Sequence, residues 1–235
     1  MPEFMVMILA SESEERKLAP SETRALVEGH AAYEGRLRAV SAYLDGERLR
    51  PSSEGRRVSS RDGQLRVDMG PFGAKALSAY YVVEAAGLDD AIRLAETCPL
   101  APGAELDVRP LMKGRLQPDR ANQQGRLFAY AVLGSAPTEQ GWIDVMDQID
   151  ERTRDCFPAD RFSGGVRLQE PARGRGVAAA GGRRAVFDGP FLESKEVIGG
   201  LFFMRMASLD DAVDWAGASE FVKHGTREIR ELWRS

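Results

Sequence analysis

Apolar positions in the first half of the chain follow two spacings, one typical of buried strands and the other of helices. Residues 4–10 form a short apolar run that predicts a buried strand. Pro20 and Ser21 then predict the start of a helix, because proline is favoured in a helix's first turn. The inward positions of this helix recur at steps of four and three, and they are Leu26, His30, Tyr33, Leu37 and Val40.

The remainder of the first half predicts strands and one more helix. The pair Asp62-Gly63 suits a tight hairpin turn, because both residues tolerate unusual backbone angles. We expect further strands at 42–49, 79–84 and 106–111. The second helix would turn Leu88, Ala91, Ile92 and Ala95 inward. The predicted order is therefore strand, helix, strands, helix, strand.

The second half predicts the same order of elements. Strands are expected at 126–133, 200–206 and 228–232, with a hairpin turn at Gly181-Gly182. The first helix of this half would bear Trp142, Val145, Met146 and Ile149, and the second would bear Leu209, Ala212, Val213 and Ala216.

Short motifs recur between the halves at nearly constant spacing. The sequence LDDA at Leu88 recurs 121 residues later at Leu209, and the turn Gly70-Pro71-Phe72 recurs 119 residues later as Gly189-Pro190-Phe191. Agreement in the same order indicates one unit used twice. We expect a first unit at residues 1–113, a polar linker at 114–125 and a second unit at 126–235.

This pattern predicts an α+β fold. Helices that cover one face of an antiparallel sheet leave the other face apolar and uncovered. Two such units can bury these faces against each other, so we expect the chain to form an internal pseudo-dimer.

Composition narrows the classes of partner. Hydrophobic residues make up 43% of the chain and charged residues 29%, as in a soluble globular protein with a proper core. The net charge of −4 argues against general binding to nucleic acid or anionic membranes, since both need clustered basic charge. The local arginines between Arg173 and Arg184 predict an exposed hairpin and its flank. Nucleic-acid binding would need interleaved aromatic residues or a wider basic face, and neither is present. Cys98 and Cys156 stand far apart in no metal-like spacing, so we interpret both as small buried hydrophobic residues in a protein of the reducing cytoplasm. The lack of a long apolar run predicts no membrane span.

The segment DGPFLESKEVIGG, followed by SLDDA and EIRELW, resembles the DGPF-motif branch of the YCII-related proteins. The first half resembles the same branch in PEFMVMILAS, GERLRPSS, its Gly-Pro-Phe turn and CPLAPGAELDVRPL. The resemblance implies two tandem ferredoxin-like units of the dimeric α/β-barrel superfamily, fused so that the usual dimer forms within one chain. It also implies a small-molecule enzyme that uses a pocket histidine and aspartate.

His30 matches the helix-borne histidine of that family. The family's aspartate has no counterpart, because Cys98-Pro99 stands at that place in the first copy and Ser219-Glu220 in the second. An imidazole on the inward stripe can exchange protons near neutral pH, which makes His30 the candidate catalytic residue. The alternative is a hydrogen-bonded core histidine. The second copy carries Met146 at the matching step, so only one half could use a histidine.

The residues around the Gly-Pro-Phe turns are candidate substrate-binding groups. In the second copy Lys195 could hold an anionic group, and Asp188 or Glu196 could bind a hydroxyl; the first copy retains Asp68 and Lys75. The alternative is a purely structural turn, in which the phenylalanine anchors the loop and the charges are solvated.

Arg109 and Arg230 occupy the same place on the last strand of each unit. An arginine there could grip a carboxylate or phosphate with two hydrogen bonds. The alternative is a salt bridge to a loop carboxylate such as Asp68 or Asp188.

The sequence therefore supports two hypotheses of function. The first is a small-molecule enzyme without metal or cofactor, whose pocket is lined by His30 and the Gly-Pro-Phe loops. The second is a non-catalytic ligand-binding or regulatory protein. The sequence lacks a GxSxG elbow, a phosphate loop and an HExxH motif, and two histidines are too few for a histidine-rich metal centre. Both hypotheses allow a small-molecule ligand and a further homodimer, and neither includes nucleic acid or membrane.

Overall fold

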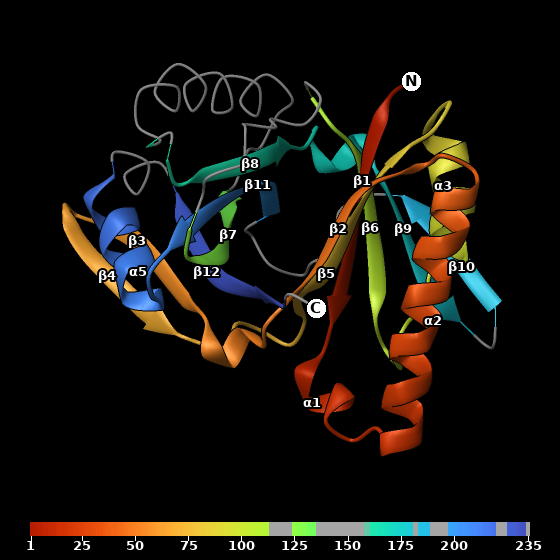
Figure 1. The fold of residues 1–235 in the computed structure, drawn as a ribbon, viewed down its shortest axis with the longest axis horizontal. Coiled ribbons are helices and arrows are strands. Elements are labelled where there is room, and N and C mark those ends of the chain that lie inside the picture. Colours follow the sequence, from red (N-terminus) through yellow and green to blue (C-terminus); the bar gives the residue numbers. More distant parts are fainter. Residues whose placement is uncertain are drawn as a thin grey trace.

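A computed structural model describes residues 1–112, 124–134, 158, 160–180, 183–188, 197–219 and 225–233. Predictions that fall on Trp142, Met146, Cys156, the Gly181-Gly182 turn or residues 189–196 lie outside this described part. Within it, twelve strands form one large antiparallel sheet accompanied by helices, which is a mixed α+β fold (Figure 1).

The first half is built around strand β1 (Glu3–Ala10), which pairs with β5 on one side and β6 on the other. Its elements after β1 are α1 (Glu12–Glu15), α2 (Pro20–Ala39), β2 (Tyr43–Leu49), the 3₁₀ turn η1 (Ser52–Glu54), β3 (Arg56–Arg61), β4 (Gln64–Met69), β5 (Ala76–Glu84), α3 (Leu88–Glu96) and β6 (Glu105–Pro110). The outer neighbour of β5 is β2.

The second half is built in the same way around β7 (Arg126–Gly134), which pairs with β11 and β12. Its other described elements are β8 (Phe162–Arg167), η2 (Pro171–Arg173), β9 (Arg175–Ala180), β10 (Arg183–Asp188), β11 (Val197–Met206), α5 (Leu209–Ala218) and β12 (Thr226–Trp233). The outer neighbour of β11 is β8.

The two halves are joined by strands that cross between them. In each half the strand after the 3₁₀ turn pairs with the last strand of the other half, so β3 pairs with β12 and β9 pairs with β6. The strand β2 also meets β12 at Leu49 and Leu232. Just beyond β6 and β8, Leu111 and Leu168 form an isolated bridge. The strand path β10-β9-β6-β1-β5-β2-β12-β7-β11-β8 stays open, because no ladder between described strands joins its ends.

Three large apolar clusters divide the core. The central cluster mixes residues from both halves, and Tyr80 of β5 stacks on Phe203 of β11 with ring centroids 5.4 Å apart. A second cluster lies between α2, α3 and the first sheet, and a third lies under α5. Figure 1 shows α2 and α3 on one side of the molecule and α5 on the other, with strands between them. Burial of these faces is the main favourable contribution to folding.

Local signals explain where the elements begin and end. The backbone N–H of Ala19 donates to the Glu22 carboxylate at 2.7 Å, which caps α2 just before Pro20. Ser208 caps α5 by accepting from the backbone N–H of Asp211 at 3.1 Å. The predicted position of Val40 is wrong: its side chain is 64% exposed, because α2 ends at Ala39 and Val40 is the C-cap.

Candidate functional site

A pocket of about 590 Å³ lies between α2 and the outer face of strands β2 and β5. Its polar lining is Glu15, His30, Glu34, Tyr43, Glu47, Arg48, Ser78 and Tyr81. The apolar lining includes Leu26 and Val27 from α2 and Pro99 and Ala101 from the segment after α3. Trp233 of β12 also lines it, so the second half of the chain contributes a side chain to this pocket.

His30 is held in the pocket by Tyr81. The Nδ1 atom of His30 and the phenolic oxygen of Tyr81 are 3.1 Å apart, and the two rings are stacked with centroids 6.1 Å apart. Tyr33 packs edge-on against Tyr81 at 5.0 Å and is fully buried. A side chain at Gly46 would place its Cβ 2.7 Å from the Tyr81 ring, so this glycine makes room for the tyrosine. Packing therefore fixes the position of Tyr81 and, through it, the imidazole.

The environment keeps the His30 ring neutral. Burial, with a smaller contribution from the Arg48 charge, lowers the pKa of His30 from 6.5 to about 4. Burial likewise raises the pKa of Tyr81, so the phenol keeps its proton. In a neutral imidazole one nitrogen donates and the other accepts. Among the described residues Nε2 makes no hydrogen bond, which leaves it available to a bound molecule.

Charged groups surround the imidazole on several elements. Glu34 is bound by Arg38 on the next turn of α2 at 2.7 Å. Arg48 of β2 lies 3.9 Å from Glu15 of α1, and burial raises the pKa of Glu15 against the attraction of that arginine. The pocket thus offers carboxylates and one guanidinium beside a neutral base.

Cys98 lies behind the pocket and not in it. Its side chain is fully buried, and burial raises the pKa of the thiol to about 12. A protonated, inaccessible thiol does not act as a nucleophile. The structure therefore agrees with the interpretation of Cys98 as a small core residue.

Arg109 and Arg230 lie outside the pocket and are almost completely buried, at 1% and 2% exposure. Arg109 pairs with Asp107 at 3.1 Å, and Arg230 pairs with Glu228 at 3.3 Å. Arg230 also donates to the backbone oxygens of Arg50 and Leu77. Each arginine therefore pairs with the carboxylate two residues before it on the same strand. Neither pairs with the loop carboxylates Asp68 and Asp188, which were the expected alternative partners.

The predicted loop residues are dispersed. Asp68 is exposed on β4, 3.9 Å from Arg66, whereas Lys75 pairs with Glu105 at 2.5 Å. Asp188 is 85% exposed and pairs with Arg175 at 2.7 Å. Lys195 and Glu196 lie outside the described residues. The structure brings none of the described three to His30.

The contacts of the first Gly-Pro-Phe turn hold its loop in place. Phe72 is buried, Arg57 stacks on its ring at 4.6 Å, and its backbone N–H donates to the Ser52 hydroxyl at 3.3 Å. No residue of Gly70-Pro71-Phe72 lines the described pocket, although such a lining was expected. The turn therefore anchors its loop, and the pocket is formed elsewhere.

Sequence reasoning missed most neighbours of His30. Glu34 was detectable, because it stands four residues after His30 on the same helix and so shares its side. Tyr81 and Arg48 lie on strands far along the chain, and no local pattern shows which strand faces α2. Trp233 comes from the other half. Tertiary packing alone brings these residues together.

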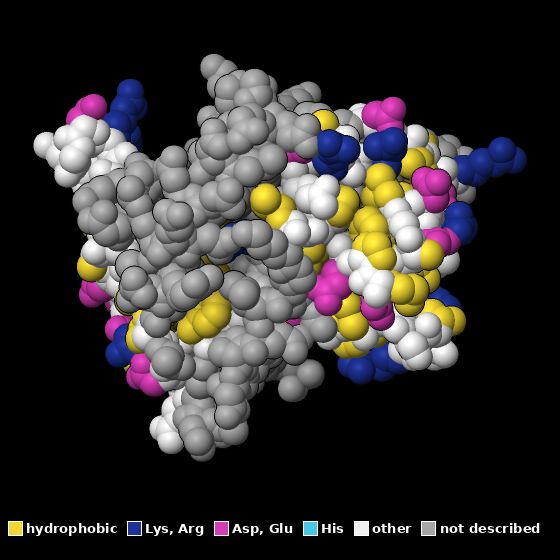
Figure 2. Space-filling view, turned by 90° about the horizontal axis from the view of Figure 1, so that it is seen from above, with side chains coloured by type: hydrophobic (Ala, Val, Ile, Leu, Met, Phe, Trp, Pro, Cys, Tyr) yellow, Lys and Arg dark blue, Asp and Glu magenta, His cyan; other side chains and the backbone are white. Residues whose placement is uncertain are grey.

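The surface and the described helices add two observations. On the described part of the face in Figure 2, acidic and basic side chains are interspersed with hydrophobic ones, with no single basic area. Within the described ranges no helix is long and apolar enough to cross a membrane, and no group of three or more His, Cys, Asp or Glu is placed to hold a metal ion.

One family model matches part of the second half of the chain. Residues 165–235 match the YCII-related domain. The matched segment includes the end of β8, η2, β9 to β12 and α5, and it does not reach the half that holds His30. No curated protein matches the chain.

Solved structures resemble the chain only distantly. A provisionally assigned chlorite dismutase aligns with 99% of this chain and 95% of its own, at 8% identity and a TM-score of 0.41. A provisionally assigned monooxygenase from Fusobacterium nucleatum aligns with 99% of this chain and 93% of its own, at 12% identity and a TM-score of 0.40. Such scores do not establish a shared fold or function.

Proposed function

We propose that this chain is a small-molecule enzyme in which His30 exchanges a proton with a substrate held in the pocket beside α2. The observation that carries the proposal is the neutral His30 ring, positioned through Nδ1 by Tyr81 and free at Nε2 among the described residues. A general base needs this combination of fixed orientation, a free lone pair and access to a cavity.

The tautomer determines the direction of transfer. When Nδ1–H donates to the Tyr81 oxygen, Nε2 carries the lone pair that accepts a proton. Tyr81 then acts as a positioning residue, because its raised pKa prevents it from taking the proton itself.

An acidic substrate group would activate the base. A base with a pKa near 4 is weak at neutral pH, since general bases work best near the operating pH. Arg48 contributes to that low value, and a substrate carboxylate paired with Arg48 would neutralise its charge. The part of the lowering that comes from Arg48 would then be relieved, which raises the pKa of His30, while the larger part that comes from burial would remain. We therefore propose a carboxylate-bearing substrate with an acidic C–H bond next to a carbonyl.

The proposed step is a proton abstraction. The C–H bond breaks, its electron pair remains on the substrate as an enolate, and the proton moves to Nε2 of His30. The proton on Nε2 then exchanges with solvent, and a solvent-derived proton returns from Nε2 to the same carbon, which restores the neutral imidazole and completes one cycle of exchange. This step can be measured before the full reaction is known.

The test is hydrogen exchange in D₂O. A panel of keto, hydroxy and unsaturated carboxylic acids is incubated with the protein, and proton NMR follows loss of the C–H signal. We expect at least one acid to exchange, and His30→Gln to slow that exchange about 100-fold, the usual contribution of a general base. Arg48→Gln should weaken binding of the same acid, seen as a higher concentration for half-maximal exchange.

Glu28→Gln is the matched control, because Glu28 is exposed on the same helix two residues from His30 and does not line the pocket. It should retain the wild-type exchange rate. Equal exchange by wild type and His30→Gln, or no exchange of any acid, would contradict the enzymatic proposal.

One observation favours a non-catalytic ligand-binding function as the second candidate. His30 is oriented by a tyrosine hydroxyl, whereas the resemblance to YCII-related proteins implies a carboxylate for that role. In that case the acids would raise the melting temperature of the wild type without exchanging hydrogen. The two functions are therefore separated by comparing thermal shift with exchange on the same panel.

We also propose that the chain consists of two tandem ferredoxin-like units of the DGPF branch, at residues 1–113 and 126–235, joined by a linker at 114–125. The matched strand pairings of the two halves support this organisation. Equivalent close approaches support it further: a Cβ at Gly55 would lie 2.8 Å from Arg230, and a Cβ at Gly174 would lie 2.4 Å from Arg109. In each case the arginine of one half packs beneath the glycine of the other.

A further inference from the structure

The strand β4 is an exposed edge of the sheet. Every one of its residues is exposed, and within the described part of the chain it pairs only with β3. Its apolar side chains Leu65, Val67 and Met69 are 50%, 44% and 69% exposed. Unprotected edge strands with apolar residues are templates for pairing with another strand.

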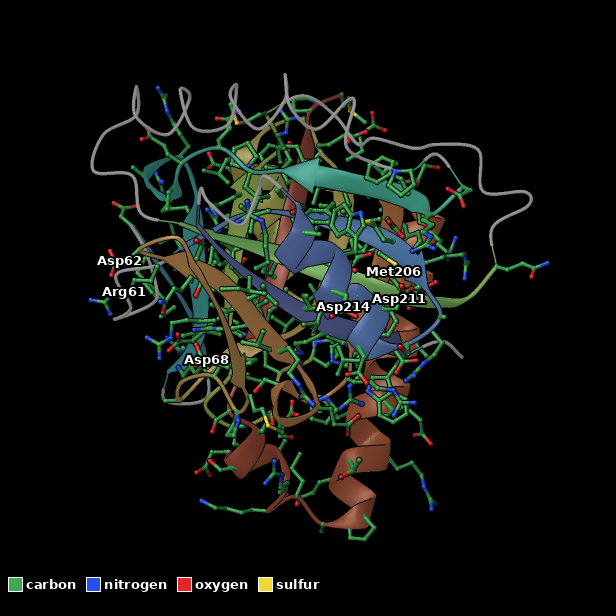
Figure 3. All side chains as sticks on the ribbon, turned by 90° about the vertical axis from the view of Figure 1, so that its left-hand side faces the viewer. Arg61, Asp62, Asp68, Met206, Asp211 and Asp214 are labelled. Carbon is green, nitrogen blue, oxygen red and sulfur yellow. The ribbon has the colours of Figure 1, made fainter. Side chains whose placement is uncertain are left out.

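The turn determines which backbone groups of β4 face outward. Asp62 and Gly63 have φ values of 53° and 76°, as a two-residue type I′ turn requires, and Arg61 pairs with Gln64 across it. Arg61 and Gln64 form a hydrogen-bonded pair in such a turn. From this pair onward, hydrogen-bonded and non-hydrogen-bonded pairs alternate along the antiparallel ladder. Arg66 and Asp68 therefore bond inward to β3, and the N–H and C=O groups of the three apolar residues point away from the sheet. Figure 3 shows Arg61 and Asp62 at the tip of this hairpin.

We propose that β4 pairs antiparallel with β4 of a second copy of this chain, around a two-fold axis at Val67. In this register Val67 faces the partner's Val67, and Leu65 faces the partner's Met69. Arg66 faces the partner's Asp68, and the symmetry repeats that ion pair. The outward N–H and C=O groups belong to the three apolar residues, so these residues would form the hydrogen-bonded pairs with the partner strand. Arg66 and Asp68 would form the non-hydrogen-bonded pairs, in which opposite side chains lie closest.

The charges on β4 are available for this pairing. Arg66 and Asp68 are 3.9 Å apart within one chain, and their side chains are 55% and 57% exposed. The corresponding edge strand β10 differs, because Arg184 already donates to the Cys98 backbone oxygen at 2.7 Å and Asp188 pairs with Arg175. Self-complementary charge thus selects β4 as the edge that meets a second copy.

The dimer is expected to be reversible. One strand ladder buries less surface than a permanent interface, so the dissociation constant should lie in the micromolar range, on the order of 10 μM. No residue of β4 lines the His30 pocket. The dimer therefore does not depend on the proposed enzymatic function, and either proposal can fail alone.

The test is sedimentation velocity at protein concentrations between roughly 1 and 100 μM, which lie on either side of that dissociation constant. Wild type should change from monomer to dimer across this range. Arg66→Asp would face the partner's Asp68, and Asp68→Arg would face the partner's Arg66, so each should weaken the dimer about tenfold or more. The double charge swap restores opposite charges and should restore the dimer.

Arg61→Asp is the matched control, because it makes the same charge change at the hairpin tip, outside the proposed register. It should dimerise like wild type. Val67→Pro removes an outward N–H that β3 does not use, so the chain should fold and remain monomeric. A wild type that stays monomeric throughout, or a dimer insensitive to the single charge changes, would overturn the proposal; circular dichroism melting verifies that each variant is folded.

Discussion

Asp107→Ala is expected to lower the free energy of unfolding by about 3–5 kcal/mol, the usual cost of leaving a buried charge without its partner. Arg109 is 1% exposed, and its ion pair with Asp107 is 3.1 Å long. Its other polar contacts are weak: the backbone oxygen of Gln169 at 3.5 Å and the sulfur of Met7 at 4.0 Å. The variant would thus leave a guanidinium in the core with little compensation.

The pair itself need not be strongly stabilising. Burial raises the pKa of Asp107 and lowers the pKa of Arg109, so desolvation outweighs their attraction at both groups. Replacing both, as in Asp107→Leu with Arg109→Met, should therefore recover most of the stability lost by Asp107→Ala. Urea unfolding at pH 7 measures all three proteins.

Asp68→Ala is the control for this series. Asp68 forms an exposed pair with Arg66, so its loss should change stability by less than about 1 kcal/mol. If Asp107→Ala cost no more than Asp68→Ala, the Arg109 charge would have to be compensated by other groups, and Asp107 would not be its essential partner.

The second prediction concerns pH. The unfolded chain protonates His30 near pH 6.5, whereas the folded chain does so only near pH 4. Between these values the unfolded state binds more protons, so stability falls as the pH falls through this window. The full difference amounts to about 3–4 kcal/mol, reached once the pH is below about 4, and almost none of it remains about one pH unit above 6.5. His30→Gln should remove this part of the acid destabilisation.

Two measurements check it. Urea unfolding of wild type and His30→Gln from pH 7.5 to pH 4.5 should show the variant gaining stability relative to wild type as the pH falls. The chain has two histidines, so His224→Gln leaves His30 as the single imidazole, and NMR titration then reads its pKa directly. A midpoint between pH 6 and 7 would show that burial does not lower the pKa of His30.

The same titration reports on the proposed function. A bound carboxylate that neutralises Arg48 should move the midpoint of His30 upward, with uptake of a proton on binding. A ligand that binds without moving the midpoint would have no carboxylate near Arg48, which would contradict the proposed carboxylate-bearing substrate.

The sequence by itself determined the local structure. Apolar periodicity located helices α2, α3 and α5 and strands β1, β2, β5, β6, β7, β11 and β12, because each face of an element must be buried or solvated along its own length. It gave no position for α1 or β8. The hairpin at Asp62-Gly63 and the start of α2 at Pro20 follow from backbone preferences of single residues. His30 was placed on an inward face by its spacing from Tyr33 and Leu37, and it lines the pocket.

The charged partners show where sequence reasoning was too restricted. Asp107 and Glu228 stand two residues before Arg109 and Arg230, and residues two apart on a strand share a face. That signal was present in the sequence. The expected alternative partners of the strand arginines were loop carboxylates such as Asp68 and Asp188, and the structure pairs these two with Arg66 and Arg175.

Only the tertiary structure decided how distant segments meet. The exchange of β3 and β9 between halves, the contact of His30 with Tyr81 51 residues away, and the presence of Trp233 in the same pocket all depend on which strand lies beside which. Local periodicity specifies which face of a strand is buried, but it does not specify which strands lie beside it. The pocket is assembled from α2, two strands and the end of the opposite half, so its chemistry appeared only when those elements packed together.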